Sequence, residues 1–402
     1  MGWAHWTWLL CMFRLGVAWK CPFISCISPL RVGISGLRSY LCQIQGFLCW
    51  WRREGKLVRS RSLWVEVRTS VIGLMQLLSK NMRMASLRLP DSIPSPAQDS
   101  ERLNLALQGR GVDEQVIVWI LGHRNAIQRK QIKDTYQQLY KESIIHRLQS
   151  KLSSGLKTAM ILWMNEAPER DAILANKALK RKRKKINQLQ VLVEIACASS
   201  PDHLMAVRQA YCSLYECSLE EDITSNISTS LQKLLVGLVS SYRHDRELVD
   251  FNLAKSEADK IHEAIEKNQL DHDDVVWILT TRNFFQLRAT FVCYKQSYEV
   301  AIDQAINSSG NGDLGSILRG VILCIVSPEK HFAEVIKAST VGYWTKDEDS
   351  LTRAIVTRAE IDMTKIKGEY FKMNNTNLDD VVRRDTSGVY KSFLMALIGA
   401  KI

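Results

Sequence analysis

The densest charge in the sequence is a run of six consecutive cations at residues 180–185. Its members are Lys180, Arg181, Lys182, Arg183, Lys184 and Lys185. Such a run can be a solvated segment between helices, a nuclear-import or nucleic-acid contact, or a patch that binds anionic lipid. The lipid interpretation has a defined energy, because each Lys or Arg near an acidic bilayer contributes about 1 kcal/mol. Charge alone leaves the three alternatives open.

Other reactive side chains show no spacing that defines an enzyme. Five cysteines beyond residue 83 form no Cys-x-x-Cys pair and mostly have apolar neighbours in the sequence: Cys197, Cys212, Cys217, Cys293 and Cys324. They are too few for a disulfide scaffold, so a reducing cytosol is the default environment. The sequence also shows no phosphate-binding glycine loop, zinc-ligand spacing or catalytic-triad pattern. We therefore predict that the protein is not an enzyme.

The positive charge is concentrated at one end of the chain. The 402 residues carry a formal charge of +12 and are 46% apolar and 24% charged, which excludes a disordered or collagen-like chain. Residues 1–83 hold 12 basic and two acidic residues, five of the ten cysteines and seven of the eleven tryptophans. The remaining residues are close to neutral, so the basic character belongs mostly to the first fifth of the chain.

Residues 1–83 have the pattern of neither a signal peptide nor a membrane span. No Lys or Arg precedes Arg14, and no stretch reaches the roughly 18 uncharged apolar residues that a spanning helix needs. A non-native leader, an organelle-targeting peptide and a membrane-apposed segment stay open as interpretations. At Met84 the sequence changes to a tail rich in Pro and Ser, residues 84–97. We expect the working protein to begin there and residues 1–83 to take no part in the fold.

From about residue 98 the apolar residues recur at helical spacing, which predicts an all-α fold. Four similar stretches begin at Trp119, Glu194, Trp277 and Arg353, and a Tyr follows the sixth residue of each stretch by twelve positions. The repeating unit is about 75–80 residues long, which is enough for five short helices. We predict four repeats with the bounds 98–179, 180–255, 256–338 and 339–402.

Three of the four stretches end in an arginine, namely Arg124, Arg282 and Arg358. A ligand contact and a structural ion pair are both possible at such positions. We favour the ion pair, because an arginine within an apolar helical pattern needs a charged partner when it is buried.

These residues resemble the annexin family, and plant annexins in particular, over about residues 84–402. The segments that carry the resemblance are the tail from Met84, the stretch His123–Lys130, Glu169–Asn176, Leu253–Ala258 and Thr352–Glu360. The resemblance implies a curved disc of four five-helix repeats, with a convex face that docks on acidic phospholipid through calcium ions. It also implies a cytoplasmic protein that attaches reversibly to the inner face of the plasma membrane or to endomembranes, with actin as a further partner.

The resemblance assigns the calcium sites to loops at the start of each repeat. Calcium takes six to eight oxygen ligands, and the family draws them from the carbonyls of a Gly-x-Gly-Thr loop and from an acid about 40 residues later. Repeat 1 keeps the loop, with Leu107, Gly109 and Gly111, but has Lys151 in place of the acid. Repeat 4 keeps the acid as Asp385, but its loop has Trp344 where the second glycine after Gly342 is expected.

Repeats 2 and 3 have no Gly-x-Gly at the corresponding positions, so we predict at most weak calcium binding, with repeat 4 the better site and repeat 1 the poorer. The alternative is that the glycines form only a turn between helices and that Asp385 only caps a helix. We further predict that Lys151 and the six-residue basic run bind lipid phosphate directly, which gives membrane binding a part that is independent of calcium.

A redox or peroxidase-like stress protein is the competing hypothesis, and it also follows from the resemblance. His123 matches a histidine to which peroxidase-like activity is attributed in plant annexins, and Cys197 and Cys324 match a pair regarded as a redox cluster. Neither pattern is supported by neighbouring residues, because His123 has no distal partner and the two thiols lie in apolar sequence.

Overall fold

The computed structural model describes residues 85–109, 111–181, 186–227, 230–309, 312–340 and 347–400. All of them belong to one structural unit of the chain, residues 73–402. Every regular element in these ranges is an α-helix. The segment 1–83, for which we predicted no part in the fold, lies outside the described residues.

The helices fall into four successive groups of five. The first group comprises α4 (Pro96–Leu107), α5 (Glu114–Leu121), α6 (Ala126–Tyr140), α7 (Ile144–Lys151) and α8 (Ser154–Met164). The second comprises α9 (Ala167–Lys180), α10 (Ile186–Cys197), α11 (Pro201–Tyr215), α12 (Leu219–Asn226) and α13 (Ser230–Ser240). The third comprises α14 (Phe251–Glu266), α15 (Asp273–Thr281), α16 (Phe284–Tyr298), α17 (Ile302–Ser308) and α18 (Gly312–Val326). The fourth comprises α19 (Pro328–Thr340), α20 (Glu348–Arg358), α21 (Met363–Asn374), α22 (Leu378–Asp385) and α23 (Gly388–Leu397). The prediction of an all-α fold of four five-helix repeats is confirmed.

Each repeat ends its third helix in the same way. The helices α6, α11, α16 and α21 are followed by a non-glycine residue with φ between 52° and 60°: Lys141, Glu216, Glu299 and Asn375. The repeated tyrosine lies five residues before each of them and is buried in every repeat, as Tyr136, Tyr211, Tyr294 and Tyr370. A left-handed residue satisfies the last carbonyls of a helix. The sequence periodicity therefore marks a turn and a core contact that recur in all four repeats.

The arginines that end the repeated stretches form the expected structural ion pairs. Arg124 Nε lies 2.7 Å from Asp99 Oδ2, and both side chains are buried. Arg358 pairs with Asp362 one helical turn away, with Nε 2.8 Å from Oδ1. Arg282 is partly exposed and donates from Nε to Glu257 Oε1 at 2.5 Å. These guanidinium groups hold helices together and are already occupied by carboxylates.

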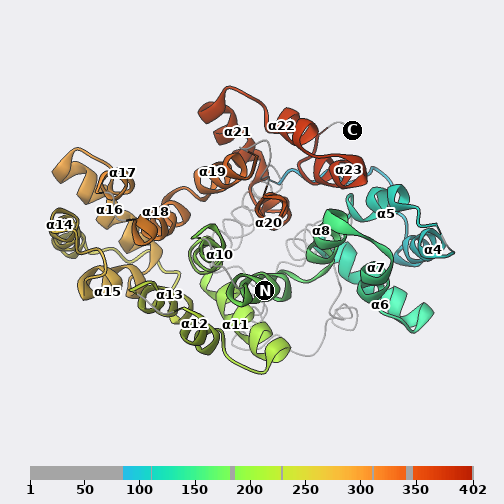
Figure 1. Cartoon of the computed structure of the whole chain (residues 1–402), viewed down its shortest axis with the longest axis horizontal. Helices are drawn as coiled ribbons and strands as arrows, with labels where there is room; N and C mark the ends of the chain where they lie inside the picture. The colour runs from blue at the N-terminus through green and yellow to red at the C-terminus, as the bar shows by residue number, and fades with distance from the viewer. Residues whose placement is uncertain are drawn as a thin grey trace, which may run out of the picture. The chain divides into compact units, whose positions relative to one another are not determined.

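Figure 1 shows the four groups around a common centre, with repeats 1 and 3 on opposite sides. Repeats 1 and 4 contact each other through α5 with α23 and through α20 with α8. Repeats 2 and 3 use the equivalent helices, α15 with α13 and α10 with α18. Within the described residues, the molecule is therefore built from two similar pairs of repeats.

The first residue of each repeated stretch has one of two environments. Glu194 on α10 and Arg353 on α20 are buried and form an ion pair between repeats 2 and 4. His331 on α19 also bonds Glu194, at 3.0 Å, and burial lowers the pKa of this histidine to about 4. Trp119 on α5 and Trp277 on α15 are instead 61% and 59% exposed. Equivalent positions thus join the centre in two repeats and face solvent in the other two.

The tail before α4 fastens repeat 1 to repeat 4. The backbone N–H of Ser86 donates to the Ala359 carbonyl at 3.0 Å, and its hydroxyl donates to the Leu397 carbonyl at 2.5 Å. Gly399 approaches so closely that a Cβ there would lie 2.2 Å from the Ser86 carbonyl oxygen. Only glycine fits that contact and the φ of +66°. The described tail is therefore part of the fold from its first residues.

Candidate calcium loops and the basic segment

The loop between α4 and α5 has the backbone that the glycines of repeat 1 were predicted to allow. Leu107 is the buried last residue of α4, and Gly109 follows with φ of +80°. A side chain at Gly111 would meet only open space, so the loop is exposed. Asp113 then starts α5 by accepting a hydrogen bond from Val116 N at 3.1 Å.

Lys151 is the last residue of α7 and reaches into this loop. Its Nζ donates a hydrogen bond to the carbonyl oxygen of Gly109 at 3.1 Å. That carbonyl is one of the oxygens that the family resemblance assigned to calcium, and an ammonium group has no lone pair with which to ligate a metal. The residues of repeat 1 therefore do not fit a calcium ion while Lys151 is present.

The four repeats can be compared at this position because their fourth helices end at equivalent residues. The last residues of α7, α12, α17 and α22 are Lys151, Asn226, Ser308 and Asp385. Of these four, only Asp385 has a carboxylate. Sequence analysis missed Asn226 and Ser308, although all four residues lie 14 or 15 positions after the repeated tyrosine. The spacing from the tyrosine therefore locates the end of the fourth helix even in repeats 2 and 3, whose loops have no Gly-x-Gly.

Asp385 does not cap the following helix, because Ser387 is the N-cap of α23. The Asp385 side chain is 8% exposed and lies 2.9 Å from Arg384 Nη2. Its hydrogen bonds raise the pKa of Arg384. The chemistry of the carboxylate fits a hard cation such as calcium. Gly342 and Trp344 lie outside the described residues.

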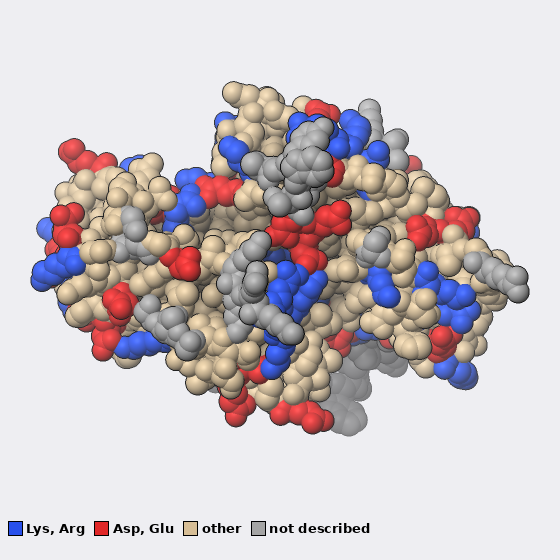
Figure 2. Space-filling view, viewed as in Figure 1, with Lys and Arg blue, Asp and Glu red and all other residues tan. Residues whose placement is uncertain are grey.

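The first two cations of the basic run are engaged within the protein. Lys180 ends α9, and its Nζ lies 2.7 Å from Asp222 Oδ1, a hydrogen bond that raises the pKa of Lys180. Arg181 pairs with Asp349 near the start of α20, and Lys177 contacts the same carboxylate at 2.9 Å. Figure 2 shows acidic and basic side chains next to each other near the middle of this face. Lys182, Arg183, Lys184 and Lys185 lie outside the described residues.

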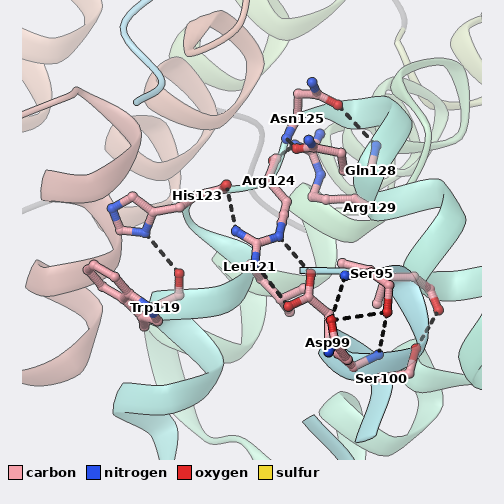
Figure 3. A network of polar contacts seen from close by, with 12 residues as sticks. Ser95, Asp99, Ser100, Trp119, Leu121, His123, Arg124, Asn125, Gln128 and Arg129 are labelled. Carbon is pink, nitrogen blue, oxygen red and sulfur yellow. Dashed lines mark hydrogen bonds and ion pairs between the residues drawn. The ribbon is translucent and has the colours of Figure 1, made fainter. Parts of the chain in front are cut away.

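His123 does not approach either cysteine of the redox hypothesis through any contact that the structure describes. Its Nδ1 lies 2.9 Å from the Trp119 carbonyl, and its ring packs on Trp119 at 4.7 Å (Figure 3). Cys197 and Cys324 are buried, and burial raises the pKa of Cys197 to about 11. A thiol with such a pKa stays protonated and unreactive. These surroundings do not favour the redox alternative.

Comparison with known proteins identifies the family. The Annexin family model matches residues 98–163, 170–238, 256–321 and 331–397, so it matches once in each group of five helices. The chain is a member of the annexin family. Annexin D3 of Arabidopsis thaliana is 50% identical over 322 residues, which is 79% of this chain and all of that protein. Annexin-like protein RJ4 of Fragaria ananassa is 41% identical over 316 residues, 79% of this chain and 99% of that protein.

Solved annexin structures show the same fold. Chicken annexin V in complex with Zn²⁺ has a TM-score of 0.72 and 32% identity, covering 79% of this chain and 99% of that one. Calcium-bound annexin (Sm)1 has a TM-score of 0.67 and 25% identity, covering 78% of this chain and 93% of that one. Annexins bind calcium, and they bind phospholipid membranes in a calcium-dependent way. In the part of this annexin that the structure describes, no helix is long and apolar enough to cross a membrane.

Proposed function

We propose that the protein is a peripheral membrane protein that binds acidic phospholipid, with calcium held at repeat 4. Asp385 would supply the carboxylate, and the loop that contains Gly342 and Trp344 would supply backbone carbonyls. The metal adds positive charge at the surface, where lipid phosphate can complete its oxygen ligands. The observation that carries this proposal is the carboxylate at the end of α22, at the position where α7 ends in a lysine.

The loop of repeat 4 departs from the family pattern, so we propose that its calcium affinity is low. Trp344 stands where glycine is expected, and a side chain restricts the backbone conformations through which carbonyls converge on a cation. Lipid phosphate must then supply more of the calcium ligands than the loop carbonyls do. Calcium affinity should accordingly be much higher in the presence of acidic vesicles than in solution.

We also propose that part of the membrane binding is independent of calcium. Lys151 uses one of its three N–H donors on Gly109, and the others can bond a lipid phosphate directly. The basic run adds further cations, of which Lys180 and Arg181 would have to exchange Asp222 and Asp349 for phosphate. A protein of this kind would act in the cytoplasm and attach reversibly to the inner face of the plasma membrane or to endomembranes.

Co-sedimentation with vesicles tests the proposal. We expect binding to phosphatidylserine-containing vesicles to be strong with calcium, reduced but present with a chelator at low salt, and weak on vesicles that lack acidic lipid. A peroxide-turnover assay on the same preparation tests the redox alternative. Peroxide turnover that is lost in His123→Ala, together with no lipid binding, would reverse the assignment.

A further inference from the structure

A shallow cavity of about 840 Å³, wide open to solvent, lies between the fifth helix of repeat 2 and the second helix of repeat 3. Its walls come from α13 and α15, with Thr224 of α12 at one end. These three helices are neighbours in Figure 1. Among the described residues, none of the loops considered for calcium and none of the basic run lines this cavity.

The cavity combines an apolar wall with charges of both signs. Val236, Val276 and Trp277 form the apolar part, and Trp277 keeps 59% of its surface exposed. Lys233 and Asp273 lie at the rim and form an ion pair in which their side chains are 57% and 83% exposed. The hydrogen bond with Lys233 lowers the pKa of Asp273, so the carboxylate is ionised at neutral pH. Asp274 adds a second carboxylate to the lining.

Gly237 brings the two helices of the cavity together. A Cβ at Gly237 would lie 2.7 Å from Thr280 Cγ2, so the backbone of α13 approaches α15 at its floor. The Thr280 hydroxyl donates its proton to the Val276 carbonyl at 2.7 Å, so it can offer a ligand only its acceptor lone pairs. The residue of α23 that corresponds to Gly237 is Ala396, because it lies eleven positions after Asp385, as Gly237 does after Asn226. The counterpart pair differs in charge, because Ser392 of α23 and Gln115 of α5 stand at the positions of Lys233 and Asp273.

The position of the cavity relates it to the proposed membrane-binding side. Thr224 lies two residues before Asn226, the equivalent of Lys151 and Asp385 at the end of the fourth helix. Asp273 is the first residue of α15, directly after the loop that corresponds to Gly109–Asp113. The same two structural features, a fourth-helix end and a loop before a second helix, form the candidate calcium sites.

We propose that this cavity binds the headgroup of phosphatidylethanolamine at a membrane surface, without calcium. The headgroup has a phosphate and a primary ammonium, and the rim offers one partner of opposite sign to each. Lys233 can bond the phosphate, and Asp273 and Asp274 can accept from the ammonium N–H groups. An exposed ion pair is held weakly and is screened by solvent, so it can exchange partners with a zwitterion. Trp277 lines the cavity, so its ring can contribute a cation–π contact with the ammonium.

The proposal rests on the membrane-binding side inferred above, but it can fail separately. Its test uses the full chain in chelator, with soluble phosphoethanolamine followed by saturation-transfer NMR. We expect binding of phosphoethanolamine, and weaker binding of phosphocholine, which has no N–H to donate, and of glycerol phosphate, which has no cation. Equal binding of glycerol phosphate and phosphoethanolamine would reduce the site to a simple anion contact and overturn the proposal.

Equivalent residues in the other pair of repeats provide matched controls. Trp277→Ala and Lys233→Gln should each weaken phosphoethanolamine binding at least about tenfold, which corresponds to about 1.4 kcal/mol. Trp119→Ala, at the equivalent position of α5, and Lys391→Gln, on the equivalent helix α23, should leave it unchanged. Equal losses in both pairs of variants would contradict the assignment, provided that circular dichroism shows all four proteins to be folded.

Vesicles distinguish a membrane lipid from a soluble phosphate ester as the natural source. In chelator, vesicles of phosphatidylethanolamine and phosphatidylcholine should retain more protein than vesicles of phosphatidylcholine alone, and Trp277→Ala should remove the difference. Binding of the soluble headgroup without any such difference would reject the lipid as the ligand. The calcium-dependent binding assigned to Asp385 should be the same in Trp277→Ala and in the unchanged protein.

Discussion

Repeats 1 and 4 each keep a different part of the annexin calcium-site pattern. Repeat 1 has the glycine loop but ends its fourth helix in Lys151, whose ammonium group bonds the loop carbonyl of Gly109 at 3.1 Å. Repeat 4 ends its fourth helix in Asp385, but its loop has Trp344 in place of a glycine. We infer from this comparison that one side chain at a helix end decides whether loop carbonyls bond the protein's own cation or are left to a metal.

On the proposed function, both repeats contribute to membrane binding. A calcium ion held by Asp385 and the ammonium of Lys151 would each add positive charge beside a loop. Calcium responds to its concentration, whereas the lysine charge is permanent. We therefore expect repeat 4 to give regulated binding and repeat 1 to give constant binding, and the following changes should separate them.

The largest effect is expected from Asp385→Asn. The amide keeps the shape of the side chain but removes the negative charge that calcium requires. Calcium-dependent sedimentation with acidic vesicles should fall at least about tenfold, or about 1.4 kcal/mol, while binding in chelator is unchanged. Asp380→Asn on the same helix is the control, because Asp380 is exposed and pairs with Arg383 at 3.2 Å. Similar losses in both variants would show that Asp385 has no special role.

Lys151→Glu should have the opposite effect on calcium. It removes the ammonium from the Gly109 carbonyl and puts a carboxylate beside a loop that already has both glycines. The calcium concentration needed for half-maximal vesicle binding should fall by about tenfold, since a first carboxylate ligand is restored. Lys151→Gln separates the two causes, because it removes the ammonium without adding a carboxylate. A midpoint that is the same in all three proteins would contradict the interpretation of this loop.

Replacement of Lys180–Lys185 by glutamine should affect only the constant part of the binding. In chelator we expect most of the vesicle binding to be lost, since several cations act together at an acidic surface. The vesicle binding of the unchanged protein in chelator should weaken steeply as the salt concentration rises, because the screening length is only about 8 Å at physiological ionic strength. Glutamine at Lys295, Lys365 and Lys372, on the third helices of repeats 3 and 4, is the control. Undiminished binding of the first variant in chelator would reject a role for the basic run.

The smallest effect is expected from a protein that starts at Met84. The tail contacts of Ser86 with Ala359 and Leu397 are retained in it, and so are all the repeat helices. Its Tm and vesicle binding should equal those of the full chain. A protein that starts at Ser95 should lose about 1 kcal/mol for each missing hydrogen bond, and its Tm should fall by a few degrees. A lower Tm for the first protein would show that the preceding residues contribute to the fold.

Much of the fold could be predicted because its periodic residues have local causes. The repeated tyrosines are buried beside the same left-handed turn in every repeat, and the repeated arginines pair with acids of neighbouring helices. These residues recur at a fixed spacing because each makes the same core contact, turn or ion pair in its own repeat. The glycine loop of repeat 1 and the position of Lys151 were identified through the resemblance to the annexin family.

The partners of the charged residues could not be predicted in the same way. Arg181 meets Asp349 across 168 positions, and Lys180 meets Asp222 in another helix. Neither contact follows from periodicity, because both depend on how separate helices pack. The cavity beside Trp277 also depends on how separate helices pack, since its lining residues come from α12, α13 and α15. The sequence places such residues on a helix but does not select their neighbours.

Exchange of the two charges tests the comparison of repeats 1 and 4 most directly. The double variant Lys151→Asp with Asp385→Lys keeps the net charge and moves the carboxylate to the repeat that has both glycines. Calcium-dependent binding to phosphatidylserine vesicles should be at least as strong as in the unchanged protein, and it should be lost in Asp385→Lys alone. If the double variant is folded but needs no calcium, or if Asp385→Lys alone still responds to calcium, the side chain at the helix end does not decide where the metal binds.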